Sequence, residues 1–136
     1  IVAIRKPLLC QGQILCGFLS IILAYCIQFL YSLIIGLLAF WLIVTWPLNM
    51  LLGAIYKLLS GAWIPVTMFP DLLYKINFFL PFRAIYAIPV TIMTSKMNTQ
   101  NIWKDIRTQL IWIIFLFVIT EIIWQIGKRK LIVQGG

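Results

Sequence analysis

The stretch from Leu58 to Met93 constrains the fold most, because it is almost as apolar as a membrane span but is repeatedly cut by prolines. The prolines are Pro65, Pro70, Pro81 and Pro89. A lipid-spanning helix needs roughly 20 unbroken apolar residues. Irregular backbone at membrane depth survives only where other protein or a water-filled cavity covers it. The spacing therefore predicts that residues 64–94 form a re-entrant segment, which dips into the bilayer from outside and returns.

The composition places the chain in a membrane. Of the 136 residues, 63% are hydrophobic, 10% are charged and none is His. A soluble domain could not cover such a surface with polar groups, so we expect a polytopic membrane protein. The net charge of +8 is interpreted as Lys and Arg at the ends of spans, which set topology. Basic residues are not interleaved with aromatic ones on a polar surface, which argues against nucleic-acid binding.

The uncharged run from Leu8 to Val44 is too long for one simple span. Its 37 residues would form a helix of about 55 Å, against a hydrocarbon core of about 30 Å. We predict two spans, 8–24 and 28–45, joined by a tight turn near residues 25–28. A single long tilted helix is the alternative.

The complete fold prediction is all-α, a polytopic membrane helix bundle with about four transmembrane helices. The third and fourth spans are expected at 48–63 and 108–126, with the re-entrant helical hairpin before the last one. Residues 1–136 form a single membrane domain. A stripe of small residues on the first span favours close helix packing. Its members are Gly12, Cys16, Ser20 and Ala24.

Two basic clusters predict the topology. Lys128, Arg129 and Lys130 form the densest cluster and should be cytoplasmic, which makes the C-terminus cytoplasmic. Arg5 and Lys6 flank the first span and should lie on the same side. Two ends on one side require an even number of spans, so the segment 64–94 should not cross the membrane.

Catalytic and metal-binding patterns are missing from the sequence, so we do not expect an enzyme. The acidic residues, Asp71, Asp105 and Glu121, are far apart in sequence, and there is no His to activate a Ser. No metal-ligand cluster and no G-x-x-x-x-G-K-[ST] loop occurs. We therefore predict no metal site and no cofactor in this chain, and any ATP hydrolysis must belong to another subunit.

A few residues are candidates for the substrate path. Lys57 falls inside the third predicted span, and with Ser60 and Gly61 it is predicted to line the path. The alternative is that its side chain extends to water at the membrane surface. In the re-entrant segment, Asp71 is expected to cap a helix over 72–79, and Phe82 to lie on its apolar side.

The proline-containing segment resembles the second half of permeases of the ABC-2 exporter class. The resemblance rests on Leu58–Pro65 (LLSGAWIP), then Phe69-Pro70, Leu80-Pro81-Phe82 and Ile88-Pro89. A bacterial branch of the class is most similar, through Ala39-Phe40-Trp41 and Gln134-Gly135-Gly136. Together these elements cover roughly residues 36–136.

This resemblance implies a plasma-membrane permease with six helices per subunit, of which the chain is the C-terminal part. It implies a homo- or heterodimer of permease subunits in the lipid bilayer. It also implies a separate cytoplasmic ABC ATPase that holds ATP and magnesium and drives export. A non-transporting structural subunit of a larger membrane complex is the second hypothesis, and a membrane-embedded enzyme is the third.

Overall fold

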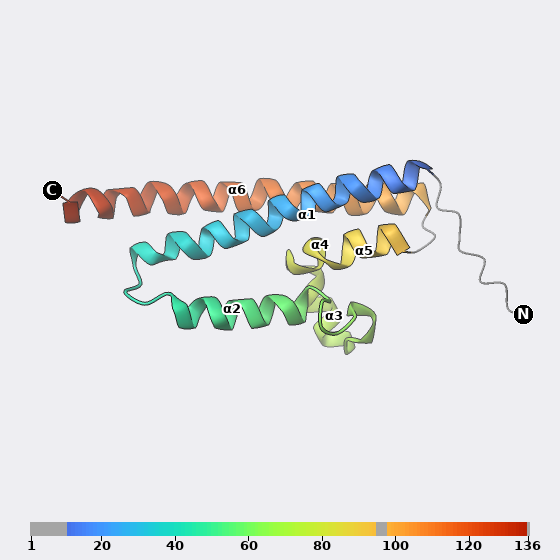
Figure 1. The fold of residues 1–136 in the computed structure, drawn as a ribbon, viewed down its shortest axis with the longest axis horizontal. Coiled ribbons are helices and arrows are strands. Elements are labelled where there is room, and N and C mark those ends of the chain that lie inside the picture. Colours follow the sequence, from blue (N-terminus) through green and yellow to red (C-terminus); the bar gives the residue numbers. More distant parts are fainter. Residues whose placement is uncertain (1–10, 95–97, 136) are drawn as a thin grey trace, which may run out of the picture.

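A computed structural model describes residues 11–94 and 98–135, and every regular element in these ranges is helical. The elements are α1 (Gln11–Leu37), η1 (Leu38–Phe40), α2 (Trp46–Leu59), η2 (Val66–Met68), α3 (Asp71–Phe78), α4 (Phe82–Ile85), α5 (Ala87–Thr94) and α6 (Thr99–Gly135). The predicted all-α class is confirmed. Figure 1 shows α1 and α6 side by side along one face, with α2 to α5 along the other side of α1.

The predicted turn between two spans at residues 25–28 is wrong, because α1 runs through it without a break. Tyr25, Cys26, Ile27 and Gln28 include no Pro or Gly that would end a helix. A break there would also leave backbone N–H and C=O groups without partners in an apolar region. The chain turns instead at residues 38–45, and Pro47 lies in the first turn of α2, where its missing N–H costs nothing.

The last helix is longer than predicted. The expected span 108–126 lies wholly inside α6, whose 37 residues extend over about 55 Å. Residues 99–101 form the first turn, and the Asn98 C=O accepts the N–H groups of Asn101 and Ile102. No Pro or Gly interrupts residues 99–126, so the helix can continue beyond the hydrocarbon core. Its polar start therefore extends out of the apolar stretch.

The prolines fragment the segment after α2, as predicted. Pro70 and Pro81 immediately precede α3 and α4, and Pro89 lies in the first turn of α5. In these positions the fixed φ of proline suits the start of a helix, and no helical hydrogen bond is lost. The result is three short helices in place of a span.

The core lies where α4 and α5 meet α1 and α6. Ile27 of α1, Ile88 and Ile92 of α5 and Ile106 of α6 are buried in it. The predicted small-residue stripe is only partly at this contact. Ser20 and Ala24 are buried, whereas Gly12 has open space around it.

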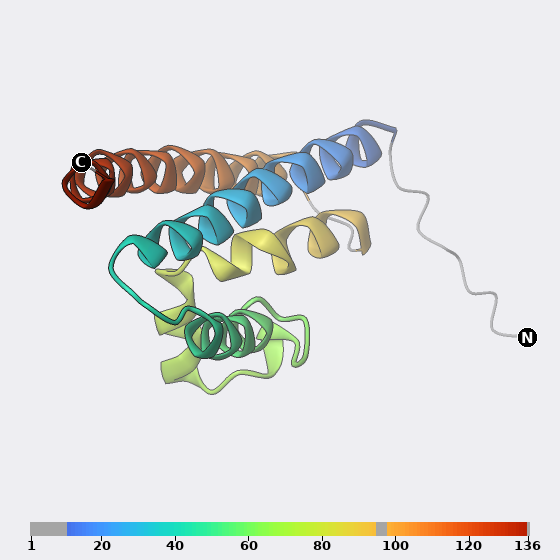
Figure 2. The same cartoon turned by 60° about the vertical axis from the view of Figure 1, so that its left-hand side comes forward.

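Two hydrogen bonds tie the segment from α2 to α5 to both halves of α1. The Tyr31 hydroxyl donates to the Leu52 C=O at 3.2 Å, which ties α2 to the C-terminal half of α1. The Gln13 side chain donates to the Ile92 C=O at 2.7 Å, which ties α5 to the N-terminal half. Figure 2 shows the same order from another side.

Two helical stretches are long and apolar enough to cross a membrane, Gln11–Phe40 and Thr99–Lys130. Only 28% and 17% of their most apolar windows are buried by the described protein, so both present apolar side chains outward. The 14 residues of α2 give a length of about 21 Å, less than the hydrocarbon core of about 30 Å. Four helices of spanning length are therefore not present in the described residues.

The directions of the two long helices also differ from the prediction. Figure 1 shows α1 and α6 running the same way, so Gln11 and Thr99 lie at one end and Lys130 at the other. If both helices cross a membrane, the chain between them must cross back. The even number of spans that placed both basic clusters on one side depended on the turn at 25–28. Arg5 and Lys6 lie outside the described residues.

Candidate functional site

The C-terminal end of α2 carries the residues that the sequence assigned to the substrate path. Helix α2 ends at Leu59, and Gly61 then adopts a φ of +89°, a conformation that favours glycine. A Cβ added there would meet Val66 Cγ2 at 3.0 Å and Ala87 Cβ at 3.7 Å. Gly61 therefore allows close contact between the end of α2, η2 and α5.

Lys57 lies in the last turn of α2 and is exposed, where the sequence placed it in the middle of a span. Its Nζ lies 5.9 Å from the centroid of the Trp63 ring, a cation–π arrangement. A cation in this turn also complements the negative end of the helix dipole. Ser60 is fully buried, and its hydroxyl donates to the Lys57 C=O at 3.4 Å.

An open pocket of about 360 Å³ lies beside this helix end. Gly61, Trp63 and Pro65 line one wall, and Tyr86 and Thr91 line the opposite one. The structure thus brings Gly61 and Pro65 together, whereas Lys57 and Ser60 are outside the lining. This pocket, the Gly61 pocket, is the place where the predicted path residues come closest to forming a common surface.

The other predicted residues of the re-entrant segment divide into two groups. Pro70 and Asp71 are exposed. The predicted cap at Asp71 is wrong, because Asp71 is the first residue of α3, Pro70 holds the N-cap position and no side chain there makes a capping hydrogen bond. A carboxylate in the first turn still complements the positive end of the helix dipole. Pro81, Phe82 and Pro89 are buried. The Phe82 ring packs edge-on against Tyr31 with 5.4 Å between centroids. These three residues anchor the segment to the core.

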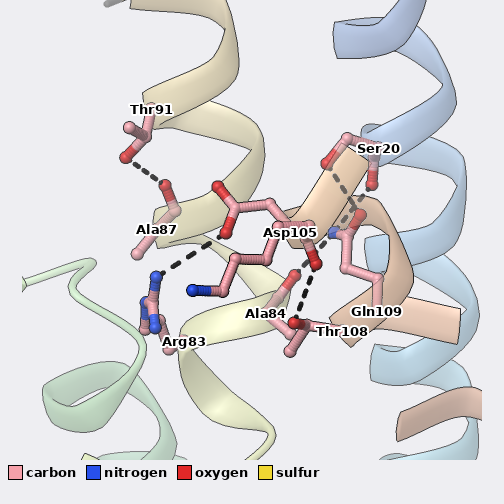
Figure 3. Close-up of polar contacts among 9 residues, drawn as sticks. Ser20, Arg83, Ala84, Ala87, Thr91, Asp105, Thr108 and Gln109 are labelled. Carbon is pink, nitrogen blue, oxygen red and sulfur yellow. Dashed lines mark hydrogen bonds and ion pairs between the residues drawn. The ribbon is translucent and has the colours of Figure 1, made fainter. Parts of the chain in front are cut away.

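A buried polar contact that the sequence did not predict joins three helices (Figure 3). Gln109 of α6 is fully buried, and its amide nitrogen donates to the Ser20 C=O at 3.2 Å and the Ala84 C=O at 2.9 Å. The Ser20 hydroxyl donates back to Gln109 Oε1 at 2.9 Å. One signal was available. Gln109 shares a helical face with Ile102, Ile106 and Leu116, which marks it as core-facing.

A second polar group lies between α3, α4 and the start of α6. Arg83 and Asp105 form an ion pair, with 3.8 Å between Nη2 and Oδ1, and Figure 3 shows the two side chains directed toward each other. The guanidinium also lies over the Phe78 ring, 5.4 Å from its centroid. An open pocket of about 330 Å³ surrounds the pair. Nothing in the sequence indicates this pair, because a partner 22 positions away cannot be assigned without the fold.

No group of three or more His, Cys, Asp or Glu side chains that could hold a metal is found among the described residues. What the geometry offers is an apolar helix pair, a fragmented segment packed on it, and two open pockets along that segment. Such an arrangement leaves room for a small molecule along the segment.

Comparison with known protein families gives a match over nearly the whole chain. Residues 4–135 match the family described as ABC-2 family transporter protein. No curated protein and no solved structure was found to match the chain. The matched region covers nearly the whole sequence and includes both long apolar helices and the segment between them. The chain therefore belongs to the ABC-2 family of membrane transporter proteins.

Proposed function

We propose that this chain is the permease subunit of an ATP-driven ABC exporter and that it forms part of the translocation path. Membership of the ABC-2 family supports a role in membrane transport. The observation that carries the proposal is the packing of α4 and α5 against the two candidate spans, with α3 packed on α4. Such fragmented helices are compatible with a membrane only where protein or a water-filled cavity covers them, as in the wall of a path.

The proposed topology has three crossings. Helix α1 crosses first, α2 and the turn after it cross back, and α6 crosses last. We place Lys128, Arg129 and Lys130, the densest basic cluster, in the cytoplasm. The basic residues from α3 to the start of α6 then lie on the outer side, against the usual distribution of positive charge. The segment 64–94 lies on the outer side as a re-entrant element, beside the polar start of α6.

We place the path along the Gly61 pocket. Gly61 and Pro65 line it directly, and the roles of Lys57 and Ser60 in the path stay predictions. The walls are aromatic and aliphatic with few charges, which suits a solute with a large apolar part. The pocket is open on one side, and residues of a second permease subunit would close it.

The proposed partners are a cytoplasmic ABC ATPase, which would hold ATP and magnesium, and a second permease subunit in the plasma membrane. Exposed apolar side chains cover the outer faces of both long helices, for example Leu15, Ile22 and Ile114 at 70%, 60% and 65% exposure. A bilayer or a second subunit is the environment that such faces require.

Affinity purification of the full-length protein from its own membrane tests the proposal. We expect an ATPase with a P-loop to co-purify, and vesicles holding the complex to export substrate only with ATP. A stable membrane complex without an ATPase would contradict the proposal and favour a structural subunit.

A further inference from the structure

The pocket around Arg83 and Asp105 is the strongest further candidate for a ligand site in the described residues. It combines cations, a carboxylate and aromatic walls in one open volume of about 330 Å³. Tyr74 and Phe78 of α3 form one wall, and Lys104 and Asp105 of α6 form the other, with Arg83 of α4 between them. We call this volume the Arg83 pocket.

The hydrogen-bonding groups of the pocket leave strong donors available. The 3.8 Å separation of Arg83 Nη2 and Asp105 Oδ1 is longer than the roughly 2.7–2.9 Å of a charge-assisted hydrogen bond, so the guanidinium retains donor capacity. Lys104 is exposed on the pocket wall. By contrast, the Thr91 and Thr108 hydroxyls donate to the carbonyl groups of Ala87 and Lys104. The donors that remain are the cationic groups of Arg83 and Lys104 and the neutral groups of Tyr74 and Asn101.

The charge of the pocket suits a group with a single negative charge. Arg83 and Lys104 contribute two positive charges and Asp105 contributes one negative charge, which leaves a net charge of +1. A phosphodiester carries one negative charge and offers oxygen atoms to guanidinium and ammonium donors. A phosphodiester between Arg83 and Lys104 would neutralise the pocket.

The surroundings indicate that the phosphodiester belongs to a lipid. Ile111 and Phe115 of α6 follow Lys104 and Thr108 on the same helical face and are exposed at 59% and 54%, so an apolar surface continues from the polar pocket. Along α6, the pocket residues precede the apolar stretch that begins at Leu110. Polar and aromatic side chains next to an apolar stretch mark the headgroup level of a bilayer.

We propose that the Arg83 pocket binds the phosphodiester headgroup of a phospholipid, with the acyl chains lying over the exposed apolar side chains of α6 that follow the pocket, Ile111 and Phe115. The phosphate oxygens accept hydrogen bonds from Arg83 and Lys104. Asp105 holds Arg83 toward the pocket and limits the affinity for anions. This site is separate from the Gly61 pocket and does not depend on whether the protein transports anything.

Lipid titration followed by native mass spectrometry tests the proposal on the full-length, delipidated protein in detergent. The probe is dioleoyl phosphatidylglycerol. Dioleoylglycerol lacks the phosphate, and glycerophosphoglycerol lacks the acyl chains. We expect specific binding of the phospholipid only. If dioleoylglycerol binds as tightly as phosphatidylglycerol, the phosphate is not recognised. If glycerophosphoglycerol binds as tightly as phosphatidylglycerol, the acyl chains do not contribute and the ligand is not a lipid.

Three variants locate the site. Lys104→Gln should weaken phosphatidylglycerol binding about fivefold, since one basic residue near a lipid surface contributes about 1 kcal/mol. Arg107→Gln is the matched control, because it removes an exposed charge one turn away on α6, outside the pocket. It should leave binding unchanged. Asp105→Asn should tighten binding, because it raises the net charge of the pocket from +1 to +2.

Two results would overturn this location. One is equal weakening by Lys104→Gln and Arg107→Gln, which would indicate a diffuse effect of charge. The other is weaker binding by Asp105→Asn in a protein that still unfolds at the wild-type temperature. If Asp105→Asn fails to fold, Arg83→Lys serves in its place. Arg83→Lys keeps the positive charge, so this variant should still bind phosphatidylglycerol. Complete loss of phosphatidylglycerol binding would contradict a phosphate held by charge.

Discussion

Gly61 and Gly53 allow the same substitution to be compared in two different surroundings. Gly61 has a φ of +89° and little room for a Cβ, whereas nothing lies within 4 Å of a Cβ at Gly53. We predict that Gly61→Leu sharply reduces ATP-dependent export at normal membrane expression, because a strained backbone costs about 1–3 kcal/mol and the new side chain enters the Gly61 pocket. Gly53→Leu should export normally. Normal export by both variants in vesicles would remove Gly61 from the path.

Gln109 is the residue whose loss should cost the most stability. Gln109→Leu would leave the Ser20 hydroxyl and the Ala84 C=O without their partner in a buried site, at a cost of about 1–3 kcal/mol for each group left unsatisfied. We predict a clear fall in the thermal unfolding midpoint in detergent. Gln125→Leu on the same helix is the control, since its amide bonds only an exposed Glu121. An equal effect of the two substitutions would refute a structural role for the buried contact.

At the level of single side chains, the sequence predicts the special role of Gly61 but not the side-chain pairs that the fold brings together. Gly61 was identified because it follows an apolar helix and precedes a proline. The pairs Ser20–Gln109 and Arg83–Asp105 were not, because their members lie 89 and 22 positions apart. Periodicity shows that Gln109 faces a core, but the identity of its partners depends on the packing of α1 and α4.

At the scale of elements, the prolines correctly predict the helix breaks in residues 64–94. The lack of proline at residues 25–28 agrees equally well with an unbroken α1. Residues 64–94 fragment next to Pro70, Pro81 and Pro89, as expected. Residues 25–28 contain no Pro or Gly, and the turn predicted there rests on the excess length of the apolar run alone. Length is a weak constraint, because a helix can extend beyond the hydrocarbon core or tilt within it. Helix α6 does so with a polar start that precedes the predicted span 108–126.

Proline substitution tests whether α1 is continuous. Cys26→Pro should abolish folding or membrane accumulation, because proline inside a helix removes a hydrogen bond and clashes with the preceding turn, at about 3 kcal/mol or more. Ile43→Pro lies in the connection before α2, where residue 43 is fully exposed, and should be tolerated. Expression and gel filtration of the two variants are the measurements. Tolerance of Cys26→Pro would restore the turn at 25–28.

At the scale of the whole molecule, the parallel arrangement of α1 and α6 sets the topology. Both candidate spans run in one direction, so the 38–98 connection must return across the membrane if both helices cross it. This return places the start of α1, the Gly61 pocket and the start of α6 on one side. The turn at 38–45 and the basic end of α6 lie on the other side.

Labelling of single cysteines distinguishes this topology from one with four spans. In a variant whose native cysteines are replaced by Ser, we predict that cysteines at Gly12, Thr67 and Asn98 react with an impermeant thiol reagent added outside intact cells. All three positions are exposed in the structure. Cysteines at Ile43 and Arg129 should react only after the membrane is permeabilised, because the C-terminal basic cluster favours the cytoplasm. The three-crossing topology requires Gly12 and Arg129 to lie on opposite sides, whereas an even number of spans puts them on the same side. Labelling of Thr67 and Asn98 from opposite faces would show instead that the segment 64–94 crosses the bilayer.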